Sequence, residues 1–279
     1  MSGVVGIFSK GEKHVSQIIY YGLYAIQHRG QISAGIAVNN NGFVDHFKEL
    51  GLVHEVFPKE TMDRLRGNIA IGHVRYGASS EGQNTMNAQP LVVGYKRGAL
   101  ALSLDGKLVN VVQLKDELED RGTIFQSDLD AEVIANLIAR YHKNDLEEAV
   151  IKTLEDIHGS YGLLVMTNDR LIGARDPYGL KPLSLGKLAG DYILASETCA
   201  FDTIGAEFIR DIEPGEVVVI DGKGVRTIRN KPKERKLCLF ELIYFARPDS
   251  KVDGKSIYLT RIEAGRQLAR ESYVDADIV

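Results

Sequence analysis

The chain has 279 residues, with 34 basic and 38 acidic side chains and a formal net charge of −4, which disfavours a nucleic-acid-binding surface because such surfaces need clustered Lys and Arg. No apolar run approaches the roughly 18 residues that a membrane span requires, and the start lacks a secretory signal, so we expect no membrane association. Two cysteines, Cys199 and Cys238, suit a reducing cytoplasm, where we expect the protein to reside. The length fits one large domain, or one domain with part of another.

The first third of the sequence predicts strands around one amphipathic helix. Gly3–Phe8 is a short apolar run typical of a buried strand. Val15–Gln27 repeats apolar residues at helical spacing, which predicts a helix with one buried face. Ile69–Tyr76 and Leu91–Leu104 have the composition of strands, although Gly and Pro interrupt them.

The middle of the chain changes from helical to strand periodicity. Between Val112 and Ile157 the apolar spacing predicts three successive helices. Strands return after Gly162, at Leu163–Thr167, Leu171–Arg175, Leu183–Lys187, Asp191–Ser196, Val217–Ile220 and Gly224–Arg229. Strands, helices and strands again, without βαβ alternation, indicate an α+β fold with antiparallel sheets.

The C-terminal part has a different character. Asn230–Lys236 (NKPKERK) is basic and contains Pro232, which is typical of an exposed connection. A helix is predicted over Leu259–Glu271, and Val274–Val279 has the alternation of a beginning strand.

Ser2 is a candidate nucleophile. Aminopeptidases remove Met1 readily before a small residue, so we expect the mature chain to begin at Ser2. An N-terminal Ser, Thr or Cys can attack a carbonyl while its own free α-amine serves as the general base. Because Ser is common at the second position, this residue alone does not establish a function.

A series of motifs extends the observation along the chain: QHRGQISAGI (27–36), GHVRYGASS (72–80), NAQPL (87–91), LDGKLVN (104–110), SDLDAEV (127–133), ARDPYGLKPL (174–183), ASETCAFD (195–202) and CLFELIYFARPDSKVDG (238–254). In this order the motifs resemble the glutaminase half of the amidophosphoribosyltransferases. Those enzymes are class II glutamine amidotransferases of the N-terminal-nucleophile hydrolase superfamily. The resemblance runs from Ser2 to Val279, and RDPYGLKPL and IYFARPDS are its most specific parts.

The resemblance implies a fold and a domain organisation. The fold is a four-layer α/β/β/α sandwich of two antiparallel sheets, with the N-terminal residue at the mouth of a glutamine pocket. Residues 1–230 would form the class II glutamine amidotransferase-like domain, and residues 231–279 a linker with the truncated start of a phosphoribosyltransferase-like domain. The acidic phosphoribosyl-binding segment of that second domain is absent, so a separate phosphoribosyltransferase subunit and a homo-oligomer are the expected partners.

The resemblance also assigns the catalytic positions, two of which are substituted. The family nucleophile is a Cys, and Ser2, a poorer nucleophile, stands in its place. The family oxyanion hole pairs an Asn side chain with the backbone N–H of the next Gly, and here Gly106 is kept while Asp105 replaces the Asn. An ionised carboxylate has no donor and repels the developing oxyanion, and losing one donor costs about 10²–10³ in rate.

The glutamine-binding positions are better preserved. Arg75 matches the arginine that clamps the glutamine α-carboxylate, a task suited to a bidentate guanidinium. Asp130 matches the carboxylate that holds the α-amine, although it could equally cap the helix starting at Ala131. The departures from the family pattern would all face one pocket, and they are Ile32, Leu104, Asp105, Lys107 and Leu129.

Other candidate residues are predicted to be structural. His28 and His73 should make structural hydrogen bonds, and Cys199 should be a buried helix residue. Cys238 stands where some family members have the first ligand of an iron–sulfur cluster, but without a C-x-x-C motif we predict no cluster and no other cofactor. The motif glycines are expected to form tight turns around the pocket, at Gly30, Gly35, Gly77 and Gly106.

Three hypotheses follow. The chain is a working glutaminase that uses Ser2, a non-catalytic relative that acts as a glutamine-binding or partner-binding module, or a fragment of a longer amidophosphoribosyltransferase-like protein. The last two are compatible with each other. Because the substitutions concentrate around the pocket while distant motifs are retained, we favour a glutaminase-like domain of the purine biosynthesis family with a dead or severely weakened site, binding glutamine weakly if at all.

Overall fold

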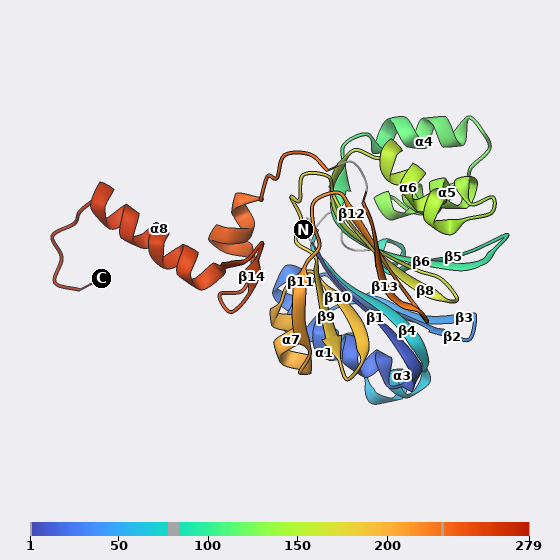
Figure 1. Ribbon diagram of the computed structural model, residues 1–279, viewed down its shortest axis with the longest axis horizontal. Helices are drawn as coiled ribbons and strands as arrows, with labels where there is room; N and C mark the ends of the chain where they lie inside the picture. The colour runs from blue at the N-terminus through green and yellow to red at the C-terminus, as the bar shows by residue number, and fades with distance from the viewer. Residues whose placement is uncertain (1, 78–83, 230–231, 279) are drawn as a thin grey trace.

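Figure 1 shows the computed structural model of the chain, which describes residues 2–77, 84–229 and 232–278. Two antiparallel sheets lie face to face. The first has seven strands in the order β11 (Glu207–Asp211), β9 (Ser184–Leu188), β10 (Asp191–Ala195), β1 (Ser2–Lys13), β4 (Gly67–Arg75), β2 (Ser33–Asn40) and β3 (Phe43–Leu50). The second has six, in the order β13 (Gly224–Arg229), β12 (Glu216–Asp221), β8 (Arg170–Arg175), β7 (Gly159–Met166), β6 (Gly98–Leu108) and β5 (Leu91–Tyr95).

Helices cover the outer face of each sheet (Figure 1). Those on the seven-stranded sheet are α1 (Val15–Ala25), α2 (Val53–Val56), α3 (Lys59–Arg64) and α7 (Cys199–Ile204). Those on the six-stranded sheet are α4 (Val111–Glu119), α5 (Asp130–Tyr141) and α6 (Leu146–Asp156). The predicted four-layer sandwich and the three successive central helices are therefore confirmed. Two short 3₁₀ turns, η1 (Gln27–Arg29) and η2 (Thr85–Asn87), lie in the connections.

Strand β1 is buried on both faces over Ser2–Phe8. Successive side chains of a strand point to opposite faces, so in β1 Val5 and Ile7 pack against the helices while Val4 and Phe8 pack between the sheets. Each such side chain contributes about 1.5–3 kcal/mol by leaving water. The double burial holds the first residue of β1 firmly in the sheet.

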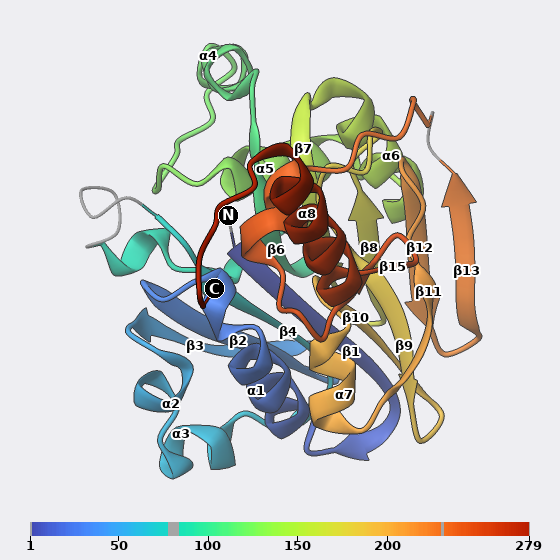
Figure 2. The same cartoon turned by 90° about the vertical axis from the view of Figure 1, so that its left-hand side faces the viewer.

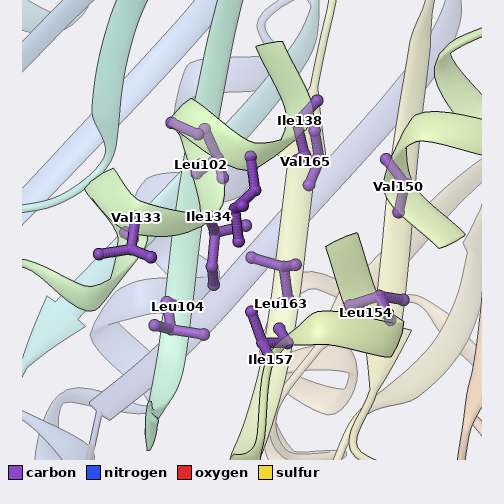
Figure 3. Packing of buried hydrophobic residues seen from close by; sticks show 14 of the residues in the cluster. Leu102, Leu104, Val133, Ile134, Ile138, Val150, Leu154, Ile157, Leu163 and Val165 are labelled. Atoms are coloured by element: carbon purple, nitrogen blue, oxygen red, sulfur yellow. The ribbon is translucent and has the colours of Figure 1, made fainter. Parts of the chain in front are cut away.

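The second helical layer packs on β6 and β7, as Figure 3 shows. Ile134 and Ile138 lie one turn apart on α5, Leu154 lies on α6, and all three pack with Leu163 and Val165 of β7. This packing fixes the start of α5, where Asp130 lies, beside the end of β6.

Some elements differ from the sequence-based expectation. The prediction did not include β2, β3, β11 or the short helices α2 and α3, and it expected α7 only as a helix that holds Cys199. A strand over Val274–Val279 is wrong for residues 274–278, which have no regular structure, and Val279 lies outside the described residues. A strand needs a neighbour for its backbone hydrogen bonds, and in the part of the chain that the structure describes none pairs with this segment.

The C-terminal part extends from one side of the sandwich (Figures 1 and 2). It contains a π-helical turn, η3 (Glu241–Phe245), a two-stranded sheet of β14 (Lys251–Val252) and β15 (Lys255–Ser256), and helix α8 (Ile257–Glu271). The basic connection is irregular and exposed over residues 232–236, as predicted, and Asn230 and Lys231 lie outside the described residues. No helix among the described residues is long and apolar enough to cross a membrane.

Candidate active site

Ser2 lies where the two sheets come together. It is the first described residue and begins β1, as the nucleophile hypothesis requires, and its register partner on β4 is Arg75. The backbone nitrogen of Ser2 donates to Asp105 Oδ1 of β6 at 2.8 Å. Two predicted catalytic positions, Ser2 and Asp105, and the predicted carboxylate-binding Arg75 are thus neighbours. Met1, whose removal we expect, lies outside the described residues.

A fully buried guanidinium, Arg29, organises this region. Its Nε donates to the Ser2 carbonyl at 2.9 Å, and Nη2 donates to Asp105 at 3.0 Å. Nη1 donates to Glu197 at 2.6 Å, and the two Nη atoms bind Glu241 in bidentate fashion at 2.9 and 2.8 Å. All five donors of the guanidinium are therefore engaged.

The Asp105 side chain is ionised. Burial raises the pKa of this carboxyl, but Lys181, with Nζ at 3.6 Å, and Arg29 outweigh burial and hold the pKa below its ordinary value. A carboxylate in this state only accepts hydrogen bonds. It therefore offers no hydrogen-bond donor at the position that the resemblance assigns to the oxyanion hole.

The residue after it, Gly106, cannot be replaced by a larger one. A Cβ there would lie 2.0 Å from the Ser160 carbonyl oxygen of the adjacent strand β7. Close approach of neighbouring backbones also explains Gly30, whose Cβ would meet Arg75, and Gly35, whose Cβ would meet the Gln89 carbonyl. The prediction of tight turns at these three glycines is wrong, because Gly35 and Gly106 lie inside strands and Gly30 is extended.

Asp130 makes contacts other than the predicted helix cap. It is the first residue of α5, and the N-cap position belongs to Leu129. Its carboxylate accepts the backbone N–H of Leu108 at 2.7 Å and the Lys107 ammonium at 3.0 Å. Lys107, one of the predicted departures from the family pattern, therefore pairs with the carboxylate predicted to hold the glutamine α-amine.

Arg75 is tied to the segment that precedes α5. Its Nη1 donates to the Asn87 carbonyl at 3.0 Å, and the Asn87 side-chain oxygen accepts the Asp128 N–H at 3.2 Å. Arg75 makes further interactions as well. Asn87 belongs to the NAQPL motif, so this motif joins the two predicted glutamine-binding segments.

The histidines and Cys199 are structural, as predicted. His28 pairs with Glu197 at 2.8 Å, and His73 Nε2 lies 3.1 Å from the Leu104 carbonyl. Burial lowers the pKa of His73 to about 4, so its ring is neutral near pH 7. Cys199 begins α7 and is buried, and both it and Cys238 are free thiols.

The described residues contain no group of His, Cys, Asp or Glu arranged to hold a metal ion.

Sequence reasoning missed the buried charges of the site. These are Arg29, Lys181, Glu197 and Glu241, and each comes from a different motif. The presence of one charged residue in each of these motifs was the signal that the four side chains could meet in one cluster. Beside them a cavity of about 760 Å³ opens between the sandwich and the C-terminal part, with Ile32, Tyr76 and Phe245 in its wall.

Comparison with known proteins relates the chain to glutamine amidotransferases. The family profile described as the glutamine amidotransferase domain matches residues 77–203. The whole chain is 44% identical to 61% of an amidophosphoribosyltransferase from Archaeoglobus fulgidus, and 99% of it is 43% identical to 58% of the one from Bacillus subtilis. The chain thus spans about three fifths of the length of these relatives.

A solved structure of the same kind of enzyme also matches the chain. The glutamine phosphoribosylpyrophosphate amidotransferase from B. subtilis, complexed with ADP and GMP, matches 99% of this chain with a TM-score of 0.93 and 42% identity, over 59% of its own length. The fold therefore agrees over nearly the whole chain. The chain therefore carries a glutamine amidotransferase domain of the amidophosphoribosyltransferase type.

Proposed function

We propose that this domain belongs to a protein of purine biosynthesis and that its glutamine-hydrolysing site is disarmed. A solved relative is described as the allosteric regulatory enzyme of purine biosynthesis. The observation that carries the second part is the ionised Asp105, held by Arg29 and Lys181 beside Ser2.

The first consequence concerns the oxyanion. Attack on the glutamine amide places negative charge on its oxygen, which an oxyanion hole stabilises with N–H donors. In our assignment Gly106 supplies a backbone donor and position 105 the second. Asp105 supplies none, and its carboxylate adds a like charge. We expect a loss of at least about 10²-fold in rate from the missing donor alone.

The second consequence concerns the general base. In a chain that begins at Ser2, the α-amine must be neutral to accept the hydroxyl proton. The Asp105 carboxylate lies 2.8 Å from this nitrogen, and an adjacent opposite charge favours the ammonium form. Ser2, already a weaker nucleophile than Cys, would therefore also lack its base.

Glutamine binding should be weak rather than strong. Arg75 and Asp130 are the residues we assign to the α-carboxylate and the α-amine. The Lys107 ammonium already occupies Asp130 and competes with the substrate amine. Calorimetric titration with glutamine up to millimolar concentration tests this, and the absence of any heat would refute retained recognition.

We also propose the domain division. Every strand of the two large sheets lies before residue 230, so residues 1–230 would be the glutaminase-like domain. Residues 231–279 would be the linker and the start of a phosphoribosyltransferase-like domain. Transfer to phosphoribosyl pyrophosphate would then need the remainder of such a domain, in the same polypeptide or in a separate subunit, and the assembly would be a homo-oligomer in the cytoplasm.

The decisive assay is ammonia release from glutamine. The purified chain is compared with a blank and with Ser2→Cys. We expect release by the parent chain to match the blank within error. Sustained turnover by the parent would show that Ser2 works as the nucleophile, and the disarmed-site proposal would be abandoned.

A further inference from the structure

The π-helical turn η3 binds the same guanidinium that holds Ser2. Its Glu241 is fully buried and takes both Nη atoms of Arg29 at 2.9 and 2.8 Å. The ring of Phe245, from the same turn, lies over the guanidinium carbon at 4.8 Å from the ring centroid. One short element of the C-terminal part thus supplies both a carboxylate and an aromatic face to Arg29.

Two other hydrogen bonds of the same guanidinium reach the pocket residues Ser2 and Asp105. Nε donates to the Ser2 carbonyl at 2.9 Å, and Nη2 donates to Asp105 at 3.0 Å. A guanidinium is a planar, rigid fork, so its contacts on one edge fix the orientation of the other edge. Glu241 therefore cannot shift without changing the contacts of Ser2 and Asp105.

A second carboxylate links the same two regions. Glu197 accepts Arg29 Nη1 at 2.6 Å with one oxygen, and with the other it accepts the Arg247 N–H at 2.9 Å and the Ser250 hydroxyl at 2.8 Å. The C-terminal part therefore contacts the Arg29 cluster through both buried glutamates. Loss of one partner from a buried ion pair leaves an uncompensated charge, which is strongly destabilising. We therefore expect a change at one of these glutamates to alter the contacts of the others.

The outer side of η3 is open. Ile243 and Tyr244 are 60% and 77% exposed, while Glu241 between the turn and the sandwich is fully buried. The same turn therefore has one side open to contact and another side bound to Arg29 through Glu241.

We propose that Glu241 is a positioning residue for the Ser2 pocket, acting through Arg29. Removal of the Glu241 charge leaves Arg29 less neutralised and increases the positive potential at position 2. The inference concerns the pocket of the proposed function but does not require that the pocket be inactive.

A thiol at position 2 reports on this coupling. In Ser2→Cys, alkylation of Cys at position 2 by iodoacetamide is followed across pH by peptide mass spectrometry, since only the thiolate reacts. The charged and titratable groups around this position are the α-amine of residue 2 itself, Arg29, Asp105, Lys181, Arg75 and His73, with Glu197, Glu241 and His28 beyond Arg29. We expect Glu241→Gln to move the midpoint down by at least about half a pH unit, equivalent to a roughly threefold faster rate below the midpoint.

The matched control is Asp249→Asn. Asp249 also lies in the C-terminal part and loses a pair with an arginine, Arg247, but this pair lies at the surface and does not touch Arg29. The control should leave the midpoint in place, and general loosening of the C-terminal part would raise the plateau rate without moving the midpoint. An unchanged midpoint in Glu241→Gln, or equal shifts in the two variants, would overturn the coupling.

A second variant keeps the test decisive if Glu241→Gln does not fold. Glu241→Asp retains the charge and shortens the side chain by one methylene, so the midpoint should stay within about 0.2 units of that of Ser2→Cys. Phe245→Leu removes the ring over Arg29 without changing any charge and should also leave the midpoint in place. A midpoint shift in either variant comparable to half a unit would contradict a charge-based coupling. Because no glutamine is present, the outcome is independent of the ammonia assay.

Discussion

Asp105 lies fully buried where the two sheets meet, and its carboxylate accepts hydrogen bonds from Ser2 and Arg29. Asn and Asp are nearly the same size, but only Asn donates to a developing oxyanion. The sequence alone predicted this position and the loss of a donor there. It did not reveal Lys181 and Arg29, which keep the carboxylate charged, because those cations lie in distant motifs.

Lys107 gives a testable effect on ligand binding. Its side chain is 73% exposed, so its ion pair with the buried Asp130 contributes at most about 1 kcal/mol. Lys107→Asn, which removes this competitor, should strengthen glutamine binding about two- to fivefold. Titration calorimetry measures the change, with Lys152→Asn as the control because it removes an exposed lysine from its pair with Glu148. Equal affinities in the two variants would show that Lys107 does not compete.

His73 makes the stability of the fold depend on pH. Burial lowers its pKa to about 4 in the folded chain, compared with about 6.5 in the unfolded chain. As the pH falls below about 6.5, the unfolded state takes up the proton first, so the folded state loses stability down to pH 4. Between pH 7 and pH 5 the free energy of unfolding should fall in both proteins. The fall should be about 2 kcal/mol smaller in His73→Gln than in the parent. Urea unfolding at both pH values tests this, and equal losses would contradict it.

At the level of elements, periodicity predicted those with one buried face. Helices α4, α5 and α6 each bury one apolar stripe in the same hydrophobic cluster, so the sequence spacing predicted them. Strand β2 was not recognised because Ser33–Val38 is buried on both faces and consists largely of small residues without alternation. The strand expected at the C-terminal end had the right alternation but no partner, and pairing is not visible in a local pattern.

The clamp between Arg175 and Asp253 attaches the C-terminal part to the sandwich. Both side chains are buried, and the guanidinium also donates to the carbonyls of Gly179, Lys181 and Ile212. Asp253→Ala should destabilise this attachment by about 3–5 kcal/mol, since it leaves a buried guanidinium without its counter-charge. Hydrogen exchange should then accelerate over residues 241–256 and remain unchanged in β1.

The control for this prediction is Asp249→Ala. Asp249 pairs with Arg247 at the surface, with both side chains more than 40% exposed, so its loss should cost less than about 1 kcal/mol. Similar exchange rates in the Asp249 and Asp253 variants would mean that the buried clamp does not hold the segment.

At the scale of the whole molecule, the site is assembled by topology. Arg29 and Glu241 are 212 positions apart in the sequence, and their contact exists only because β1 lies centrally in its sheet and η3 docks beside it. The resemblance to a known family predicted the sandwich and the pocket residues. The charge balance among the motifs required the folded chain, because no local pattern encodes which distant charges meet.

The central claim is that Ser2 and Asp105 together silence the glutaminase site. Ammonia release from glutamine by Ser2→Cys, Asp105→Asn and the double variant Ser2→Cys/Asp105→Asn tests it most directly. We predict that only the double variant turns over well, at least about 10²-fold faster than Ser2→Cys alone, since both the nucleophile and the oxyanion donor must be present. Equal rates for Ser2→Cys and the double variant would contradict the role assigned to Asp105.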